Sequence, residues 1–368
     1  MGKLFETTSI NGMTLSNRFV RSATWEGMAA DDGSCTPKLI KLMGQLADGG
    51  VGLIITGLSY ITRESQAAPW QMGAASDVHL SGLKAMTDAV HGEGGKIALQ
   101  IAHGGCYSMT QLTGCEAVAP SGNESGLYPC CREMTMAEIG EVVKAFGASA
   151  LLAKKAGFDA VQIHAAHGYL LSQFFSPFFN RRNDSYGGSI ENRARVVVET
   201  LREVRKSVGK DYPVLIKINS EDFVPNGLTV DEMLQVAKTL ELEGIDAIEM
   251  SGGTVYASGE FSAIRTGSFN TPEKEVFYRE AAARFRETIR VPLMLVGGIR
   301  SPEVADKLVN DGLTDYISMS RPLIREPGLI NRWKSGDMGR ARCISDNACF
   351  GPAVKGEGLY CIREQSLS

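Results

Sequence analysis

Short runs of β-branched and aliphatic residues recur along the chain, and each is followed by a segment with helical periodicity. The runs lie at Phe19–Thr24, Val51–Thr56, Lys96–Ile101, Ala160–His164, Val214–Asn219, Ala247–Met250, Pro292–Val296 and Tyr316–Met319. Runs of this length and composition are typical of β-strands. The pattern therefore predicts eight strands with helices between them.

The intervening helices are predicted by apolar residues at spacings of three and four. They include Ala137–Lys155, Ile190–Val208 and Val230–Glu243. In the last of these the apolar positions are Val230, Met233, Leu234, Ala237 and Leu240, which lie on one face of a helix. Gly157, Gly209 and Gly244 follow the helical segments and act as stop signals.

Eight strand-then-helix units favour an α/β fold of the (β/α)8 class, a TIM barrel, with a doubly wound sheet as the alternative. No low-complexity linker divides the chain. We therefore expect one barrel over residues 1–335 and a short C-terminal tail over 336–368 that carries Cys343, Cys349 and Cys361. Two segments, Gly104–Thr135 and Asn180–Ser189, are longer than a barrel needs and follow the third and fourth strands, where barrel enzymes build their sites.

Composition and charge exclude several classes of function. The 368 residues contain 38 Lys and Arg against 42 Asp and Glu, a net charge of -4 with no basic run, so a nucleic-acid partner is not expected. The apolar runs are far too short to span a membrane. The N-terminal MGKLFETTSING lacks the apolar segment of a secretory signal, so we expect a cytoplasmic protein. In that setting the 8 cysteines do not predict a disulfide framework.

Polar residues on the predicted strands converge on the mouth of the barrel. Strand residues alternate between the interior and the helices. In the third strand Leu99 and Ile101 form the outward set, which leaves Gln100 inside. The same alternation turns His164 and Lys217 inward on the fourth and fifth strands. The alternative for each one is a satisfied polar group of the core or rim, but together they indicate a site.

The loops after the seventh and eighth strands carry signs of a phosphate site. Gly297 and Gly298 follow the seventh strand, and Arg321 follows the eighth. In many barrels these two loops bind a phosphate through backbone N–H groups, and a guanidinium can pair with its oxygens. A Gly-Gly pair can equally be a tight turn, so the indication depends on the arginine and on the barrel itself.

Two neighbouring motifs resemble a known family. They are HAAHGYLLSQFFSP at 164–177 and NRRNDSYGGSIENR at 180–193. Both closely resemble the old yellow enzyme family, the FMN-dependent ene-reductases, and the likeness extends to Asn17-Arg18-Phe19, His103-Gly104-Gly105 and Arg321-Pro322-Leu323. Within the family the chain is most similar to the bacterial NADH:flavin oxidoreductase and 2,4-dienoyl-CoA reductase branch.

This resemblance implies that FMN lies over the C-terminal face of the barrel. Lys217 would stand beside the N1/O2 edge of the flavin, where a cation stabilises the reduced ring, and Gln100 would bond the pyrimidine edge. The remaining cofactor residues implied by the resemblance are Ser22, Ala23, Thr24, Gly57 and Leu58 around the ring, with Gly297, Gly298, Ser320 and Arg321 around the phosphate.

The resemblance also implies the catalytic residues and the reaction. NADH or NADPH reduces FMN at N5 and leaves, and an α,β-unsaturated carbonyl compound, an enone or an enoyl thioester, then receives the hydride at Cβ. His164 and His167 would hold the carbonyl oxygen, and Tyr169 would protonate Cα because a phenol is neutral at pH 7. His164 and His167 converge only if the chain turns at Ala165–Ala166.

Other assignments stay open at this point. Glu26, Tyr256 and Arg265 are candidate substrate contacts, with solvated loop residues as the alternative. Two other functions fit parts of the sequence: a flavin-free barrel lyase or isomerase that uses Lys217 as a Schiff base, and a non-catalytic flavin-binding protein. The physiological substrate and the choice between NADH and NADPH are not readable. Relatives form homo-oligomers, and the resemblance implies one here without fixing its size.

The tail cysteines depart from the pattern of the branch, in which a cysteine cluster holds a [4Fe–4S] centre. Here Asp346 stands where a cysteine of a C-x-x-C-x-x-C run is expected, between Cys343 and Cys349. Three thiolates and one carboxylate are a poor ligand set for such a cluster. We therefore assign no metal to the chain, and a cluster, a zinc ion and unligated thiols remain the alternatives.

Overall fold

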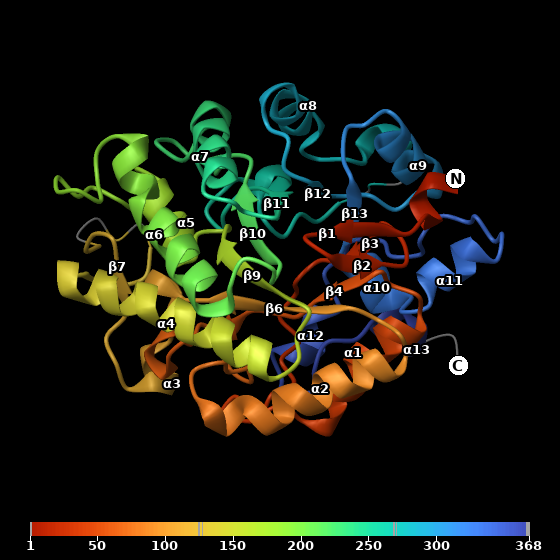
Figure 1. Cartoon of the computed structure of the whole chain (residues 1–368), viewed down its shortest axis with the longest axis horizontal. Helices are drawn as coiled ribbons and strands as arrows, with labels where there is room; N and C mark the ends of the chain where they lie inside the picture. Colours follow the sequence, from red (N-terminus) through yellow and green to blue (C-terminus); the bar gives the residue numbers. More distant parts are fainter. Residues whose placement is uncertain (1, 124–125, 127, 268, 270, 366–368) are drawn as a thin grey trace.

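Eight parallel strands close into a barrel in the computed structural model, which describes residues 2–123, 126, 128–267, 269 and 271–365 (Figure 1). The barrel strands are β3 (Phe19–Arg21), β4 (Leu53–Ile55), β6 (Ile97–Ala102), β9 (Ala160–Ala165), β10 (Val214–Asn219), β11 (Ala247–Ser251), β12 (Leu293–Val296) and β13 (Tyr316–Met319). Each pairs with its neighbour in chain order, and β13 pairs with β3 to close the ring. The predicted (β/α)8 barrel is confirmed, and the doubly wound sheet is wrong.

Helices surround the barrel (Figure 1). The longer ones are α1 (Pro37–Asp48), α2 (Leu80–Gly92), α4 (Met136–Lys155), α6 (Ile190–Val208), α7 (Val230–Leu242), α8 (Arg279–Thr288) and α9 (Pro302–Asn310). The shorter ones are α3 (Thr110–Thr113), α5 (Leu170–Phe175), α10 (Arg321–Arg325), α11 (Leu329–Lys334), α12 (Phe350–Ala353) and α13 (Ile362–Gln365). Three of the long helices begin at a threonine whose side chain accepts a hydrogen bond from the first turn, which satisfies a free backbone N–H there. None of the helices in the described part of the chain has both the length and the apolarity needed to cross a bilayer.

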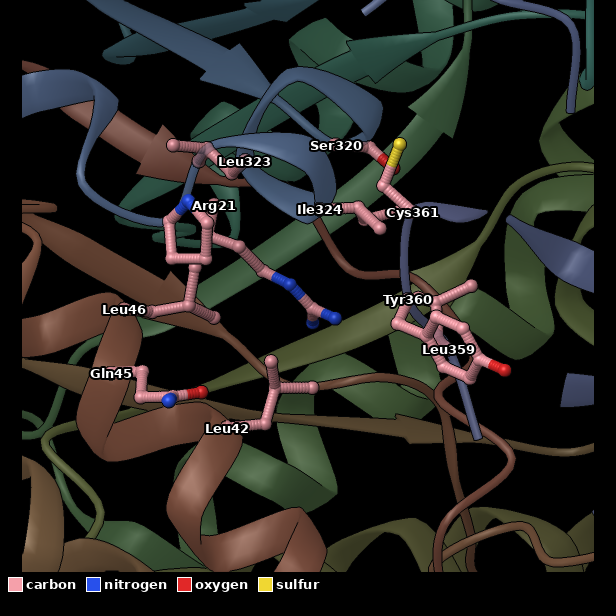
Figure 2. A pocket seen from close by; sticks show the side chains of 11 residues that line it. Arg21, Leu42, Gln45, Leu46, Ser320, Leu323, Ile324, Leu359, Tyr360 and Cys361 are labelled. Carbon is pink, nitrogen blue, oxygen red and sulfur yellow. The ribbon is translucent and has the colours of Figure 1, made fainter. Parts of the chain in front are cut away.

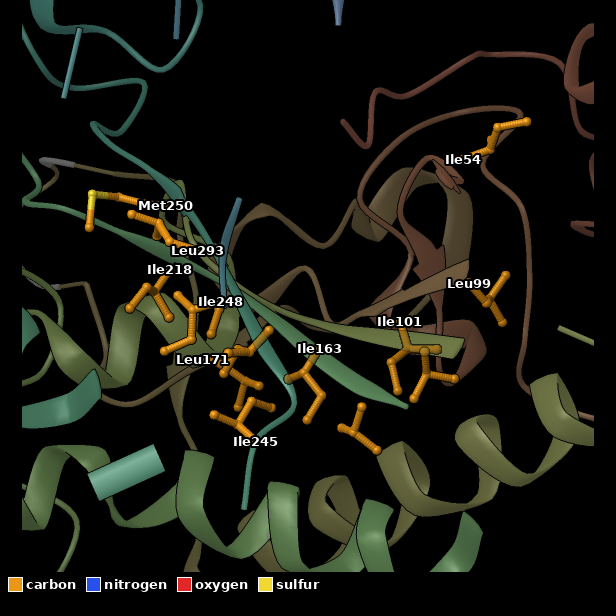
Figure 3. Packing of buried hydrophobic residues seen from close by; sticks show 14 of the residues in the cluster. Ile54, Leu99, Ile101, Ile163, Leu171, Ile218, Ile245, Ile248, Met250 and Leu293 are labelled. Carbon is orange, nitrogen blue, oxygen red and sulfur yellow. The ribbon is translucent and has the colours of Figure 1, made fainter. Parts of the chain in front are cut away.

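Aliphatic side chains fill the space between the strands and the helices. Leu99 and Ile101 of β6, Ile163 of β9 and Ile218 of β10 point outward into this layer, where Figure 3 shows them with their neighbours. All four are almost completely buried. Burial of such a side chain contributes roughly 1.5–3 kcal/mol. The outward set predicted from the alternation is the one observed, so the opposite set faces the barrel interior.

A hairpin closes the N-terminal end of the barrel. Strands β1 (Thr8–Ile10) and β2 (Met13–Leu15) are joined by Asn11 and Gly12, both with positive φ, at 41° and 79°. Asn-Gly is the preferred sequence for such a two-residue turn because both residues tolerate that conformation. Apolar side chains of the hairpin pack against the interior residues at this end of the strands. The large cavity of the described part of the chain lies at the opposite end.

The long loop over residues 104–135 folds back on the barrel. It contains a 3-10 turn, η4 (Gly105–Tyr107), the short helix α3 and the two-residue strands β7 (Val118–Ala119) and β8 (Arg132–Glu133); positions 124, 125 and 127 lie outside the described residues. Arg182, from the second long segment, donates hydrogen bonds to the carbonyl oxygens of Pro120 at 2.8 Å and Met134 at 2.7 Å. These bonds fasten the two long loops to each other beside the barrel mouth.

The tail after residue 335 returns to the barrel mouth. The N–H of Ala341 donates to the carbonyl of Arg300 at 3.0 Å, and the N–H of Leu359 donates to that of Glu26 at 2.9 Å. Phe350 and Val354 then line the cavity at the mouth. The boundary at residue 335 stays an interpretation of the sequence, and the last three residues lie outside the described part. The tail is nevertheless a wall of the site.

Candidate active site

A cavity of about 560 Å³ opens at the C-terminal ends of the barrel strands. Its walls come from most of the strands, the loops that follow them and the tail. Most of the residues predicted for the site line it: Ser22, Ala23, Thr24, Leu58, Gln100, His164, His167, Tyr169, Lys217, Gly297, Gly298, Ser320 and Arg321. Side chains far apart in the sequence are therefore brought to one place by the closure of the barrel.

Glu26 and Gly57 do not line this cavity. Glu26 is 4% exposed, and its carboxylate accepts hydrogen bonds from Arg21 at 2.9 Å and from the N–H of Gly57 at 2.8 Å. A Cβ on Gly57 would lie 2.2 Å from the Glu26 carboxylate, which explains the glycine. The assignment of Glu26 as a substrate contact is thus corrected: it is an internal partner of Arg21. The N–H of Gly57 is likewise engaged within the barrel wall.

A second, smaller cavity of about 360 Å³ lies behind this wall. Figure 2 shows it between side chains of α1, side chains of α10 and the tail residues Leu359–Cys361, with the guanidinium of Arg21 projecting among them. Ser320 lines both this cavity and the larger one. The hydroxyls of Thr24 and Ser320 lie 2.6 Å apart and share one hydrogen bond. The pair therefore forms part of the partition between the two spaces.

Tyr256 and Arg265 lie behind the cavity lining. The ring of Tyr256 is 6.3 Å from that of Tyr107, which does line the cavity. Arg265 is 7% exposed, and its guanidinium lies 4.4 Å from the ring centre of Phe277. The Arg265 carbonyl accepts a hydrogen bond from Arg321 at 2.7 Å. Neither residue is among those that line the cavity in this structure, and their role as substrate contacts stays a prediction.

A cation and an amide meet at one end of the cavity. Lys217 donates a hydrogen bond to the hydroxyl of Ser22 at 2.8 Å and pairs with the carboxylate of Glu249 at 3.3 Å. Gln100 donates to Gln162 at 2.7 Å. Sequence reasoning missed Glu249 as a site residue. The alternation within β11 could have identified it, since Glu249 pairs in register with Lys217 on the neighbouring strand.

Two arginines and a glycine pair form a second group of residues that line the cavity. Gly298 has a φ of +78°, and a Cβ there would lie 2.5 Å from the ring of Phe277, so this turn requires glycine. Arg300, which sequence reasoning missed, lines the cavity beside Arg321. Both guanidinium groups donate to neutral oxygens of the tail and of Arg265. Burial lowers the pKa of both arginines, so an anion beside them would be favoured.

The histidines and the tyrosine meet where β9 ends. His167 has a φ of +61°, and this turn brings its ring to 5.6 Å from that of His164, edge to face. The ring of Tyr169 lies 4.6 Å from that of His164. His167 is held by its backbone N–H, which donates to Asn219 at 3.0 Å, and by its Nε2, 2.7 Å from the hydroxyl of Ser251. The three rings therefore form one cluster at the cavity.

Burial sets the protonation of this cluster. It lowers the pKa of His164 well below the ordinary value, with the positive charges of His167 and Lys217 as lesser causes. It lowers the pKa of His167 to about 3 and raises the pKa of Tyr169 to about 12. Near pH 7 the cluster thus presents two neutral imidazoles, which can donate hydrogen bonds, and an intact phenol, which can donate a proton.

The residues present fit an FMN molecule. The lining offers an amide and an ammonium for the polar edge of a flavin, and two guanidinium groups and Gly298 for a phosphate. Ser318 Oγ and His164 Nδ1 are buried, belong to residues that line the cavity, and have no hydrogen-bond partner among the described residues. Buried polar atoms of this kind usually have a partner, and a bound polar ligand would supply one.

Residues 3–338 match the model of the NADH:flavin oxidoreductase / NADH oxidase family. The chain belongs to this family. The match covers the whole barrel and confirms the resemblance drawn from the two motifs after the fourth strand. It identifies the chain as an FMN-type flavin oxidoreductase barrel.

Known proteins and solved structures resemble the chain over most of its length. It is 34% identical to the NADH oxidase of Thermoanaerobacter brockii over 361 residues, 95% of this chain and 54% of that protein. A structure of 2-naphthoyl-CoA reductase with 2-naphthoyl-CoA aligns with a TM-score of 0.89 and 30% identity, covering 98% of this chain and 56% of the other. An old yellow enzyme homologue from Zymomonas mobilis aligns with a TM-score of 0.79 and 28% identity, covering 92% and 94%. The chain thus spans about half the length of the first two.

The structure brings the three tail cysteines to one place. Cys343, Cys349 and Cys361 line one small cavity, but no group of three or more His, Cys, Asp or Glu residues there is placed to hold a metal ion. The carboxylate of Asp346 is engaged by Arg363 at 2.9 Å and by the N–H of Ala348 at 3.2 Å. The residues present therefore do not fit a [4Fe–4S] cluster.

Proposed function

We propose that the chain is an FMN-dependent reductase that uses NADH or NADPH to saturate the C=C bond of α,β-unsaturated carbonyl compounds. The observation that carries the proposal is the cluster of His164, His167 and Tyr169 in the flavin-type cavity. Bound FMN would supply the hydride chemistry. The side chains of the cavity would bind the cofactor, orient the substrate and move the proton.

The two histidines bind and polarise the substrate carbonyl in this proposal. Both imidazoles are neutral near pH 7, since burial lowers the pKa of each, so each donates a hydrogen bond from one ring nitrogen. The hydroxyl of Ser251 holds Nε2 of His167, which fixes the direction of that ring. Two donors aimed at one oxygen stabilise the negative charge that develops there as the hydride arrives at Cβ.

Tyr169 donates the proton to Cα in this proposal. Its ring packs against those of His164 at 4.6 Å and Tyr107 at 5.7 Å, so the phenol is held in one orientation. Burial raises its pKa to about 12, which keeps the proton on the oxygen throughout the physiological pH range. A positioned general acid of this kind contributes typically 10²–10⁴-fold to the rate.

The rest of the cavity binds the cofactor. Arg300, Arg321 and the turn at Gly297–Gly298 would hold its phosphate, and Gln100 and Lys217 would meet the polar edge of its ring. The ion pair of Lys217 with Glu249 argues against a flavin-free lyase. A Schiff base requires an uncharged, free amine, whereas the amine of Lys217 is held in an ion pair with a buried carboxylate at 3.3 Å.

The test is anaerobic reduction of the FMN-loaded chain. We expect NADH or NADPH to bleach the flavin, and an enone to restore its colour with formation of the saturated ketone. A panel from small cyclic enones to enoyl-CoA thioesters then defines the substrate class. If NAD(P)H bleaches the flavin but no enone restores its colour, the result would contradict ene-reduction. A chain that stays colourless after addition of FMN would contradict the flavin function itself.

A further inference from the structure

Five buried polar side chains form one continuous chain of contacts beneath the cavity. Lys217 Nζ bonds Ser22 Oγ at 2.8 Å and pairs with Glu249 Oε2 at 3.3 Å. Gln162 Nε2 donates to the same carboxylate oxygen at 2.9 Å, and Gln100 Nε2 donates to Gln162 Oε1 at 2.7 Å. The chain runs from β6 through β9, β11 and β10 to the end of β3. Glu249, at its centre, is 0% exposed.

The carboxylate fixes the direction of every bond in this chain. An ionised carboxylate only accepts hydrogen bonds, so Gln162 must turn its Nε2 toward Glu249. That leaves Oε1 of Gln162 as the acceptor, and Gln100 must turn its own Nε2 away from the cavity. Gln100 therefore presents its amide oxygen to the cavity that it lines. An acceptor at this place fits a ring edge that offers an N–H.

Glu249 also determines how much charge Lys217 presents. The side chains of the two residues are 3% and 0% exposed, so solvent screens the pair weakly. An ammonium has three donors. One is given to Ser22, and the charge of the ammonium is paired with the Glu249 carboxylate at 3.3 Å, so donor capacity remains for a ligand in the cavity. The carboxylate of Glu249 thus largely compensates the positive charge that Lys217 presents to the cavity.

We infer that Glu249 is a positioning residue of the flavin site: through Lys217 it lowers the affinity for the reduced, anionic flavin, and through Gln162 it fixes the Gln100 amide. The inference rests on the proposed function, because it needs FMN in the cavity. The Glu249 carboxylate thus influences two properties of the site. They are the reduction potential of bound FMN and the orientation of the Gln100 oxygen that accepts the ring N–H.

The experiment measures the midpoint potential of bound FMN in Glu249→Gln, against a reference dye. Glutamine keeps the shape and an acceptor for Gln162 but removes the negative charge. We expect reduced FMN to gain affinity by about tenfold relative to oxidised FMN, as the loss of a nearby compensating charge implies. For a two-electron couple that is about 30 mV more positive. Glu199→Gln, on the outer helix α6, is the matched control and should leave the potential unchanged.

Two further variants separate charge from positioning. In a Lys217→Met background Glu249→Gln should shift the potential far less, because a fully buried carboxylate that has lost its cation takes up a proton, so that position 249 is neutral with either residue. Gln162→Leu keeps the ion pair but releases the Gln100 amide, so FMN affinity should fall about tenfold while the potential stays within a few millivolts of wild type. This variant keeps the inference testable if Glu249→Gln does not fold.

Specific results would overturn the inference. They are a wild-type potential in folded Glu249→Gln, an equal shift in the Lys217→Met background, or unchanged FMN affinity in Gln162→Leu. The proposed function fails separately: in that case the wild-type chain does not bind FMN, or NAD(P)H does not reduce it. Reduction and turnover with an unmoved potential would remove only the role of Glu249.

Discussion

Replacing Tyr169 with phenylalanine removes a single hydroxyl from the cavity. The ring contacts with His164 at 4.6 Å and Tyr107 at 5.7 Å stay, so the packing is retained. Burial raises the pKa of the phenol to about 12, so at pH 7 the lost group is a proton donor and carries no charge. Loss of a general acid typically slows its step by about 10²–10⁴-fold. That range corresponds to roughly 3–5 kcal/mol of transition-state stabilisation.

The assay follows the two half-reactions separately by anaerobic stopped-flow absorbance of the flavin. Reduction of Tyr169→Phe by NADPH should match wild type within about twofold, since no proton reaches Cα in that step. Reoxidation by 2-cyclohexenone should be slower by the factor given above. Tyr212→Phe is the control: its hydroxyl donates to the Phe158 carbonyl at 2.8 Å, outside the cavity. Reoxidation of Tyr169→Phe at the wild-type rate would refute the assignment.

Three further predictions concern the phosphate end, the histidines and the tail. Arg321→Ala should weaken FMN binding by about 10–100-fold, the scale of one charged hydrogen bond, and leave riboflavin binding unchanged; equal losses for both ligands would contradict a phosphate role. The pKa of His167 is lowered by burial to about 3. Its contribution to stability is therefore complete above the unfolded value near 6.5 and is lost as the pH falls from there toward 3. The free energy of unfolding, measured with denaturant, should fall less over this window in His167→Asn than in wild type, by at most about 1.4 kcal/mol per pH unit. An identical fall in the two proteins would contradict the buried, neutral state of His167. The purified chain should contain no stoichiometric iron or zinc by elemental analysis, because Asp346 is engaged by Arg363; one or more metal ions per chain would overturn this.

Periodicity alone predicts the barrel and its inward residues. The runs at Val214–Asn219 and Tyr316–Met319 have the same bounds in the structure as in the sequence pattern. Gln100, His164 and Lys217 follow from alternation with a period of two, which a closed barrel obeys because its outer face is covered by apolar helices. The local sequence pattern was therefore sufficient to predict residues whose orientation follows from alternation within a single strand.

Residues whose role depends on a distant partner were not predictable. The Glu26 carboxylate accepts a hydrogen bond from the N–H of Gly57, which lies 31 positions further along the chain, and nothing in the local sequence signals that contact. Arg300 lines the cavity where the tail residues Cys343 and Ser345, more than forty positions away, accept hydrogen bonds from its guanidinium. Loops and tails are positioned by tertiary hydrogen bonds without periodicity. Their contribution to a site is therefore visible only in the folded chain.

The most direct test of the account is a single turnover without oxygen. The FMN-loaded chain is reduced with one equivalent of NADPH and then mixed with one equivalent of 2-cyclohexenone, and the flavin spectrum and the product are measured together. We expect full reoxidation, with one cyclohexanone formed per flavin. A flavin that stays reduced, or a product in which the carbonyl is reduced and the C=C bond retained, would contradict it.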